Sequence, residues 1–184
     1  DFEDSLTPTF NNLMQGQMNI KDAIKKKIDF IDKKNGKKYK LNKKTAVLII
    51  RPRGLHLEEK NVTINNKRIS ATFFDLGLAL YHNAKTLLKN GSGPYFYLPK
   101  LENHLECRLL SDVISFSEKK LLLKQGSIKV TVLIETINAV FQMDEFLWEL
   151  RNNIVGLNAG RWDYLFSYQK VYRNTKKVIL PDRS

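Results

Sequence analysis

The chain has 184 residues and a formal net charge of +12, and its 42% hydrophobic and 27% charged residues are typical of one globular domain. No apolar run approaches the roughly 18 residues that span a bilayer, which excludes membrane insertion, and the composition excludes general disorder. A single cysteine, Cys107, excludes an internal disulfide framework and a cysteine-cluster zinc site.

The first residues are acidic, whereas a secretory signal peptide starts with a basic segment. The chain does not open on methionine, so we expect it to begin inside a longer protein. The segment ending at Phe2, Glu3 and Asp4 is predicted to be the last part of a truncated first strand.

The basic excess is local. Residues 21–44 contain eleven lysines and three aspartates, a net charge of +8. Within them, Asn35-Gly36 lies between two short aromatic and aliphatic runs and predicts a β-hairpin with a two-residue turn, which we place at residues 28–42. A solvated surface hairpin is favoured over a polyanion contact. Because nothing resembles a nucleic-acid-binding motif, no nucleic-acid partner is expected.

Apolar runs then alternate with helical spacing. Residues 45–50 (TAVLII) are β-branched and apolar throughout, as in a parallel strand buried on both faces. Further strands are predicted at residues 94–98, 128–134 and 164–168. Helices are predicted at residues 69–88, 105–116 and 140–150, between consecutive strands.

This alternation predicts a parallel sheet, either doubly wound or a (β/α)₈ TIM barrel. The barrel is favoured because three strands in a row end at a charged residue, Arg51, Lys100 or Glu135, where barrel strands present polar groups. A doubly wound nucleotide fold needs a glycine-rich turn after its first strand, and residues 91–93 (GSG) precede a strand instead. Since a barrel takes about 250 residues, we expect about five of its eight strands, incomplete at both ends.

Two features could carry chemistry. Glu135 and Arg51, at strand ends, form either a carboxylate and cation pair facing one cleft or a structural ion pair at the barrel rim. Residues 156–164 contain Gly156 and Gly160 before Asp163. They are either backbone N–H donors for an anion beside a metal-binding carboxylate or a tight turn. The residues alone leave both choices open.

Several longer motifs resemble those of the malate synthases, in their shorter form. The strongest is GLNAGRWDYLF at residues 156–166. The others are DFEDSLTPTF (1–10), IIRPRGLHLEEK (49–60), GSGPYFYLPKLENHLE (91–106), VLIET (132–136) and LPDR (180–183). Because they occur in order over essentially the whole chain, they are together far more specific than one short pattern.

The resemblance implies a Mg²⁺-dependent enzyme of the glyoxylate cycle that condenses acetyl-CoA with glyoxylate and hydrolyses malyl-CoA to malate and CoA. It implies that residues 1–184 form part of the TIM-barrel catalytic domain. The general base, an aspartate, would lie in a C-terminal domain outside this chain, so we expect the chain alone to be inactive. No membrane partner is expected, and family members occur in the cytoplasm or in peroxisomes and glyoxysomes.

The resemblance also implies the site. Glu135 and Asp163 match the metal ligands of the family, although Asp163 precedes a predicted strand and the strand-end rule alone misses it. Arg51 matches the arginine at the thioester oxygen, where a guanidinium stabilises enolate charge. The remaining matches are Gly160, Arg161 and Trp162 at the glyoxylate carboxylate, and Asp1 and Glu3 near the metal and its waters, which strand alternation would put on one face.

The sequence departs from the family at Leu55, usually tryptophan, at Asn153, usually histidine, and at Asn103, usually serine. These changes spare the metal ligands and make the acyl-CoA contacts less certain. Cys107 is predicted to be a small core residue and not a nucleophile. The three histidines lack metal-ligand spacing and are predicted to be structural: His56, His82 and His104.

Two rival functions remain. A related, citrate-lyase-like acyl-CoA lyase would use the same kind of Mg²⁺ site to cleave its substrate. A catalytically dead paralogue would bind partners or polyanions through the lysine-rich hairpin, with strong salt dependence.

Overall fold

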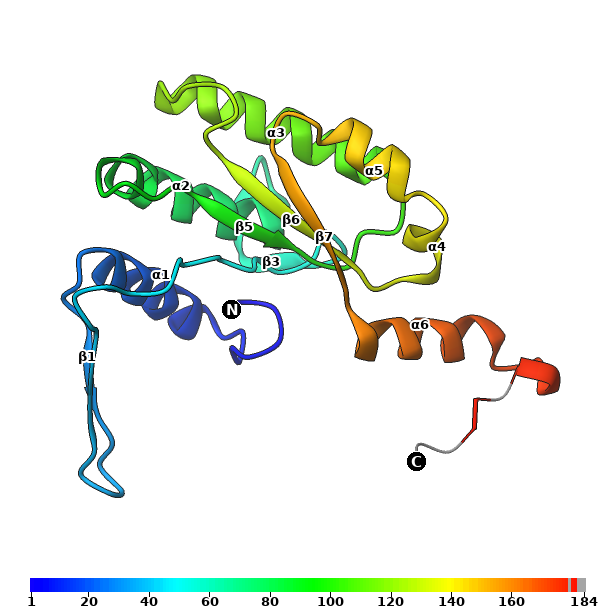
Figure 1. Ribbon diagram of the computed structural model, residues 1–184, viewed down its shortest axis with the longest axis horizontal. Coiled ribbons are helices and arrows are strands. Elements are labelled where there is room, and N and C mark those ends of the chain that lie inside the picture. The colour runs from blue at the N-terminus through cyan, green and yellow to red at the C-terminus, as the bar shows by residue number, and fades with distance from the viewer. Residues whose placement is uncertain (179, 182–184) are drawn as a thin grey trace.

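A three-stranded parallel sheet lies at the centre of the molecule (Figure 1). The computed structural model describes residues 1–178, 180 and 181. The strands are β5 (Tyr95–Leu98), β6 (Lys129–Ile134) and β7 (Ile154–Ala159), in that order across the sheet. Leu98 pairs with Val132 and Val132 with Leu157, so the three carboxyl ends lie at the same edge. The fold is mixed α/β, and within the described residues the sheet does not close into a barrel.

Helices cover one face of this sheet (Figure 1). They are α2 (Ala71–Lys89), α3 (His104–Leu121) and α5 (Met143–Glu149), while α1 (Phe10–Ile24) packs against α2. The remaining helices are α4 (Ile137–Val140), α6 (Arg161–Tyr172) and the short 3₁₀ helix η1 (Lys176–Val178). No described helix is long and apolar enough to cross a membrane.

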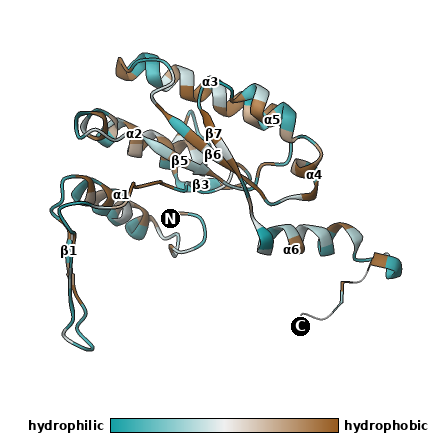
Figure 2. Ribbon diagram, in the orientation of Figure 1, coloured by the Kyte–Doolittle hydropathy of each residue, from teal (hydrophilic) through white to brown (hydrophobic). Residues whose placement is uncertain are grey.

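The core lies between the sheet and these helices. Phe96, Leu98, Val130 and Val132 are buried and pack with buried leucines and isoleucines of α2 and α3, and Figure 2 shows the apolar character of the central strands. The alternate residues of β5 and β6 are partly exposed on the other face: Tyr95, Tyr97, Lys129 and Thr131. The sheet therefore has one covered face and one open face.

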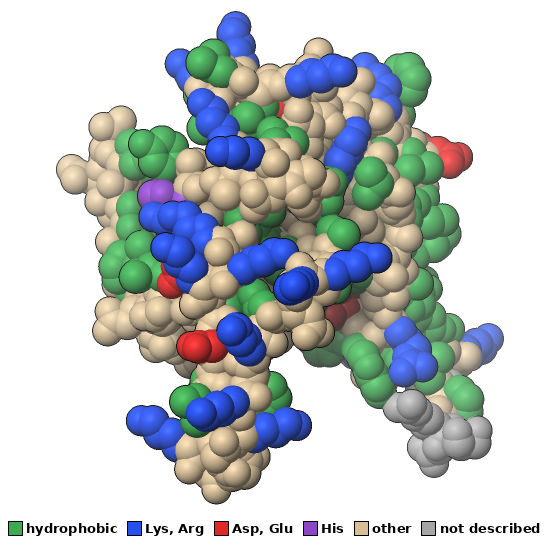
Figure 3. Space-filling view, turned by 60° about the vertical axis from the view of Figure 1, so that its left-hand side comes forward, with side chains coloured by type: hydrophobic (Ala, Val, Ile, Leu, Met, Phe, Trp, Pro, Cys, Tyr) green, Lys and Arg blue, Asp and Glu red, His purple; other side chains and the backbone are tan. Residues whose placement is uncertain are grey.

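Two antiparallel hairpins flank the sheet. In the lysine-rich segment, β1 (Asp29–Ile31) pairs with β2 (Lys38–Lys40), and all six residues are exposed. Four residues separate Asp32 from its partner Lys37, whereas the sequence predicted a two-residue turn. Gly36 adopts the left-handed conformation that the turn requires, with φ +69°. The pair projects from the body and carries part of the basic surface (Figure 3).

The second hairpin was not predicted. Strand β3 (Glu58–Ile64) pairs with β4 (Lys67–Ser70), and the two residues between them, Asn65 and Asn66, both have positive φ. Asparagine tolerates this conformation better than most residues, so an Asn-Asn pair suits a type I′ turn. The pair could have been recognised as a turn signal between two extended runs.

The strand predicted at residues 45–50 is wrong. Only Ile50 pairs with the sheet, through a parallel bridge to Phe96, while Val47, Leu48 and Ile49 are exposed. The segment lies at the outer edge of the sheet, beside β5. The predicted strand at residues 2–4 is also absent, although the Phe2 N–H donates to the Arg51 carbonyl at 2.9 Å and its ring is buried.

The strand predicted at residues 164–168 is wrong as well, because this aromatic segment lies inside α6. The strand is instead the preceding β7, in which glycine and asparagine interrupt the apolar run that would indicate a strand. Helix α1 was missed, although Thr9 caps it by accepting from the Asn12 N–H. The helix predicted at residues 140–150 is interrupted, since α4 ends at Val140 and α5 begins at Met143.

Candidate functional site

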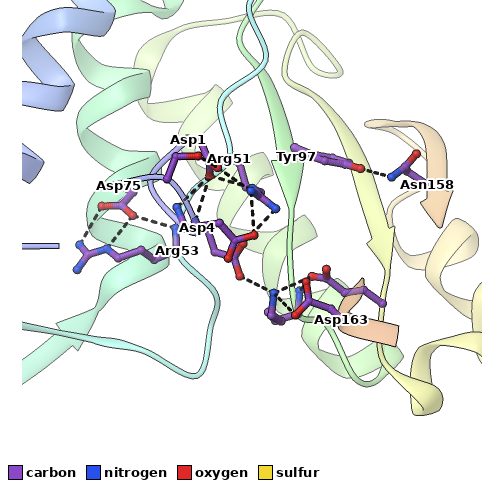
Figure 4. Close-up of polar contacts among 12 residues, drawn as sticks. Asp1, Asp4, Arg51, Arg53, Asp75, Tyr97, Asn158 and Asp163 are labelled. Atoms are coloured by element: carbon purple, nitrogen blue, oxygen red, sulfur yellow. Dashed lines mark hydrogen bonds and ion pairs between the residues drawn. The ribbon is translucent and has the colours of Figure 1, made fainter. Parts of the chain in front are cut away.

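Charged residues follow each of the three parallel strands. Glu135 directly follows β6, and Lys100 lies two residues after the end of β5. Asp163 lies in the first turn of α6, just after β7, so the strand-end rule does locate it once β7 is placed correctly. Because parallel strands end at one edge, the three side chains meet there, and Figure 4 labels Asp163 among them.

Glu135 is fixed by the backbone around it. Its side chain is 1% exposed, and its Oε1 accepts from the Lys100 backbone N–H at 2.6 Å. Gly160 packs so closely that a Cβ there would lie 2.6 Å from the Glu135 Cβ, so only glycine fits. Burial raises the pKa of Glu135 to about 6; Lys100 opposes this rise, and the charges of Asp163 and Glu3 add to it.

The ammonium group of Lys100 lies among three carboxylates. Its Nζ is 2.6 Å from Glu3 Oε1, 3.1 Å from Asp163 Oδ1 and 3.5 Å from Glu135 Oε1. Burial alone would lower the pKa of Lys100, but these anions outweigh it and the pKa is raised. From the sequence, Lys100 was recognised as a charged residue at a strand end but was given no role. Its position at the carboxyl end of a strand already indicated a site residue.

Arg51 is held by the amino-terminal acidic residues. Its Nε and Nη2 donate to both carboxylate oxygens of Asp1, at 2.9 and 2.6 Å, while Nη1 lies 3.1 Å from Glu3 Oε2 and Nη2 lies 3.1 Å from Asp4 Oδ2. Glu3 thus contacts both Arg51 and Lys100. Asp1 and Glu3 do converge on the site, but through a loop and not through strand alternation.

Through Lys100, the network joins five of the residues that the family resemblance assigned to the site: Asp1, Glu3, Arg51, Glu135 and Asp163. With Lys100 included, it comes from five separate segments of the chain.

The other predicted residues form the start of α6. Gly160 precedes the helix, and its N–H donates to the Ile134 carbonyl at 2.9 Å, which extends the pairing of β6 and β7. The first N–H groups of a helix lack intrahelical acceptors and attract anions. The Trp162 side chain is 63% exposed, and the Arg161 guanidinium lies over its ring at 5.0 Å. Beside Glu135 this segment places the backbone of Gly160.

Two residues on the open face of the sheet were missed. Asn158 Nδ2 donates to the Tyr97 hydroxyl (Figure 4). Burial raises the pKa of Tyr97, the charge of Glu135 adds to the rise, and Arg51 opposes it. The alternation of tyrosine with phenylalanine and leucine in β5 was the signal that Tyr97 lies on the face opposite the core.

A buried ion triad supports the segment that carries Arg51. Arg53 Nε and Nη2 donate to Asp75 at 3.0 and 2.9 Å, and its Nη1 donates to Glu59 at 2.9 Å. The three residues are 5% exposed or less. Asp75 lies in α2 and Glu59 in β3, so the triad ties both elements to the residues next to Arg51.

The departures from the family pattern make other contacts in the structure. Asn153 is buried, and its Nδ2 donates to the Ile128 carbonyl at 2.8 Å and to Glu118 at 3.3 Å. Leu55 packs against the core. Cys107 is fully buried, as predicted for a core residue, and burial raises its pKa to about 12, which disfavours the nucleophilic thiolate.

Shape alone does not locate the site. A hollow of about 520 Å³ lies between α6 and the residues that follow it, and another of about 210 Å³ lies on the open face of the sheet near Ile49, Tyr95 and Val155. Neither is lined by the charged residues at the strand ends. We locate the site by its charges. Burying several ionic groups together costs desolvation free energy, and groups with perturbed pKa values cluster at functional sites.

The donor atoms suit a hard cation. Glu3, Glu135 and Asp163 offer carboxylate oxygens around one point, and Glu3 Oε2 is buried without a hydrogen bond from the described residues, although Arg51 lies 3.1 Å away. As placed, no three Asp, Glu, His or Cys side chains in the described part of the chain are arranged to hold a metal ion. The Lys100 ammonium lies at that point instead.

Comparison with known proteins adds family evidence. Residues 47–184 match the family model described as "Malate synthase, TIM barrel domain". Over its full length the chain is 51% identical to malate synthase from Myxococcus xanthus, 51% to malate synthase A from Escherichia coli and 50% to glyoxysomal malate synthase from Candida tropicalis. It covers 34% of each, so the chain spans about a third of the length of these curated relatives.

Proposed function

Because the chain belongs to the malate synthase family, we propose that its protein condenses acetyl-CoA with glyoxylate, in a Mg²⁺-dependent reaction, and hydrolyses malyl-CoA to malate and CoA. The observation that carries this proposal is that Glu3 joins Arg51 to Lys100, whose ammonium group lies beside Glu135 and Asp163 at the carboxyl edge of the sheet. The predicted location is the cytoplasm or, in a eukaryote, the peroxisome or glyoxysome, and relatives named glyoxysomal support the second.

Glu135 and Asp163 would hold the Mg²⁺ ion, with Glu3 beside them, because carboxylate oxygens are the ligands that this ion prefers. When bound, the ion would polarise the glyoxylate carbonyl towards attack. The first N–H groups of α6, after Gly160, would bind the glyoxylate carboxylate, as helix N-termini bind anions. Gly160 permits this approach because it carries no side chain against Glu135.

Arg51 would stabilise the charge that develops on the thioester oxygen when the acetyl methyl group loses a proton. Asp1 holds its guanidinium through two hydrogen bonds, and Asp4 and Glu3 neutralise it from other sides. A donor already fixed in place stabilises such charge without reorganising during the reaction. No residue of this chain is assigned as the general base, which we still expect outside residues 1–184.

The test uses the complete natural protein. Free thiol should appear from acetyl-CoA only when glyoxylate and Mg²⁺ are both present. Glu135→Ala and Asp163→Ala should raise the Mg²⁺ concentration for half-maximal rate by about tenfold or more. Arg51→Ala should mainly lower kcat, by roughly 100-fold. Glu145→Ala, at an exposed position of α5, is the matched control and should behave like the wild type.

Unchanged kinetics in all three site variants would overturn the assignment of the site. Cleavage of malyl-CoA without any condensation would instead support a citrate-lyase-like enzyme.

A further inference from the structure

We propose that Lys100 is the resident cation of the carboxylate cluster formed by Glu3, Glu135 and Asp163. Its ammonium group holds the cluster together in the metal-free protein and leaves it when a divalent cation binds. This inference rests on the proposed function for its metal. It adds an exchange step and a positioning residue that the proposed chemistry does not require.

The geometry matches the donor capacity of an ammonium group. Lys100 Nζ has three N–H bonds and lies within 3.5 Å of one oxygen of each of the three carboxylates. These come from the amino-terminal loop, from the end of β6 and from the start of α6. In the part of the chain that the structure describes, the ion pairs of Glu135 and Asp163 are both made with Lys100.

The cluster needs a cation to remain assembled. The Glu3 and Glu135 side chains are 5% and 1% exposed, so water screens their mutual repulsion poorly. Arg51 neutralises Glu3 from the other side, but it makes no ion pair with Glu135 or Asp163 among the described residues. Lys100 is therefore the group that balances these two carboxylates when no metal is bound.

Lys100 and a divalent cation cannot occupy the same point. Mg²⁺ requires oxygens at about 2.0–2.1 Å and would repel an ammonium group held among its own ligands. The lysine stem can move, because it is a flexible chain of four carbons and 23% of the side chain is exposed. The backbone of Lys100 is held separately from its side chain, since its N–H donates to Glu135 Oε1 at 2.6 Å.

Metal binding then becomes an exchange of one cation for another. The charge of Lys100 weakens the binding of any cation that enters. It weakens the binding of monovalent cations most, because their weaker attraction to the carboxylates compensates least for the displacement of the ammonium group. The carboxylates remain close together throughout, so the ligands need little rearrangement.

The first experiment measures the reactivity of Lys100 in the complete natural protein. Amines are acetylated briefly with and without Mg²⁺ at one pH, and the labelled peptides are quantified by mass spectrometry. Labelling of Lys100 should increase several-fold when Mg²⁺ binds. Lys129, which is partly exposed and contacts the Asn152 carbonyl, is the internal control and should not change.

The second experiment removes the ammonium group. Lys100→Met should bind Mg²⁺ roughly tenfold more tightly by calorimetry, within the usual range for groups that adjoin a metal site. Without metal the variant should melt at a lower temperature than the wild type, and Mg²⁺ should remove most of the difference. Lys129→Met is the matched control, for which neither affinity nor melting temperature should change.

The outcomes separate the two proposals. If calorimetry shows Mg²⁺ binding while the labelling of Lys100 stays constant, the exchange is overturned and the proposed function stands. If neither the wild type nor Lys100→Met binds Mg²⁺, both are overturned. The labelling needs no variant, so it decides the question even if Lys100→Met fails to fold.

Discussion

Glu135 shows how position determines the properties of a side chain. It lies at the end of a buried strand, is 1% exposed and has the charges of Glu3 and Asp163 beside it. Burial raises its pKa to about 6 from an ordinary value of 4.5, even though Lys100 favours the ionised form. In the metal-free protein, Glu135 therefore takes up a proton at a higher pH than it would in an unfolded chain.

This shift predicts a specific pH dependence of stability. Between pH 4.5 and about 6, the folded protein binds a proton at Glu135 that the unfolded chain has released. The resulting stabilisation is complete below pH 4.5 and is lost as the pH rises through about 6. In Glu135→Gln this contribution is absent. As the pH rises from 4.5 through about 6, the free energy of unfolding of the wild type should therefore fall relative to that of the variant. The fall should be on the order of 1 kcal/mol after allowance for solvent screening.

The measurement is urea denaturation of both proteins from pH 4.5 to 8 with a metal chelator present. The comparison with the variant cancels the other titrating groups. A constant difference across this range would show that the pKa of Glu135 is not raised.

At the scale of elements, the buried triad links α2 and β3 to the segment beside Arg51. Asp75 accepts from the backbone N–H of Arg53 as well as from its guanidinium. We predict that Asp75→Asn lowers the free energy of unfolding by about 1.5–3 kcal/mol, because a neutral amide replaces one of the two carboxylates that bind the buried Arg53 guanidinium. Asp112→Asn, at an exposed position of α3, is the control and should change stability by less than about 0.5 kcal/mol. Urea denaturation at pH 7 measures both, and a loss below 1 kcal/mol for Asp75→Asn would contradict the prediction.

The same scale shows what the sequence could predict. Strands β5 and β6 were located because their apolar residues stand between clear breaks and are truly buried. Strand β7 was missed because glycine and asparagine weaken its apolar signal, and the aromatic start of α6 suggested a strand because aromatic residues favour extended structure. Periodicity alone therefore could not place Asp163, whereas the family resemblance gave it a role without needing the strand.

The contacts of the amino-terminal segment could not be predicted from periodicity. That Glu3 reaches Lys100 across 97 positions depends on how the amino-terminal loop folds back beside the sheet. Such a contact has no periodic signal, and only the resemblance brought Glu3 into the candidate site. The three-carboxylate position of Lys100 was missed for the same reason.

At the scale of the whole molecule, positive and negative charge are separated. The net charge is +12, and Figure 3 shows lysine and arginine side chains spread over one face and over the projecting β1–β2 pair. The strand ends, by contrast, gather five carboxylates around Arg51 and Lys100. A basic exterior favours the approach of anions, which the proposed substrates are.

The β1–β2 pair contributes charge and little packing. Its strand residues are all exposed, and Phe30 contacts Tyr39 within the pair itself, with ring centroids 6.0 Å apart. Replacing residues 29–40 by a short glycine and serine linker should change the free energy of unfolding by less than about 0.5 kcal/mol. Denaturation in urea tests this, and a loss above about 2 kcal/mol would show that the pair supports the fold.

The three strand ends also fix a spacing. Neighbouring strands in a sheet lie about 4.8 Å apart, a distance set by main-chain hydrogen bonding. Lys100, Glu135 and Asp163 each follow one of these strands, so their intervals depend on the sheet and not on the identity of the side chains packed behind it. Insertions on the helical side of the sheet can therefore occur during evolution without changing the distances between Lys100, Glu135 and Asp163.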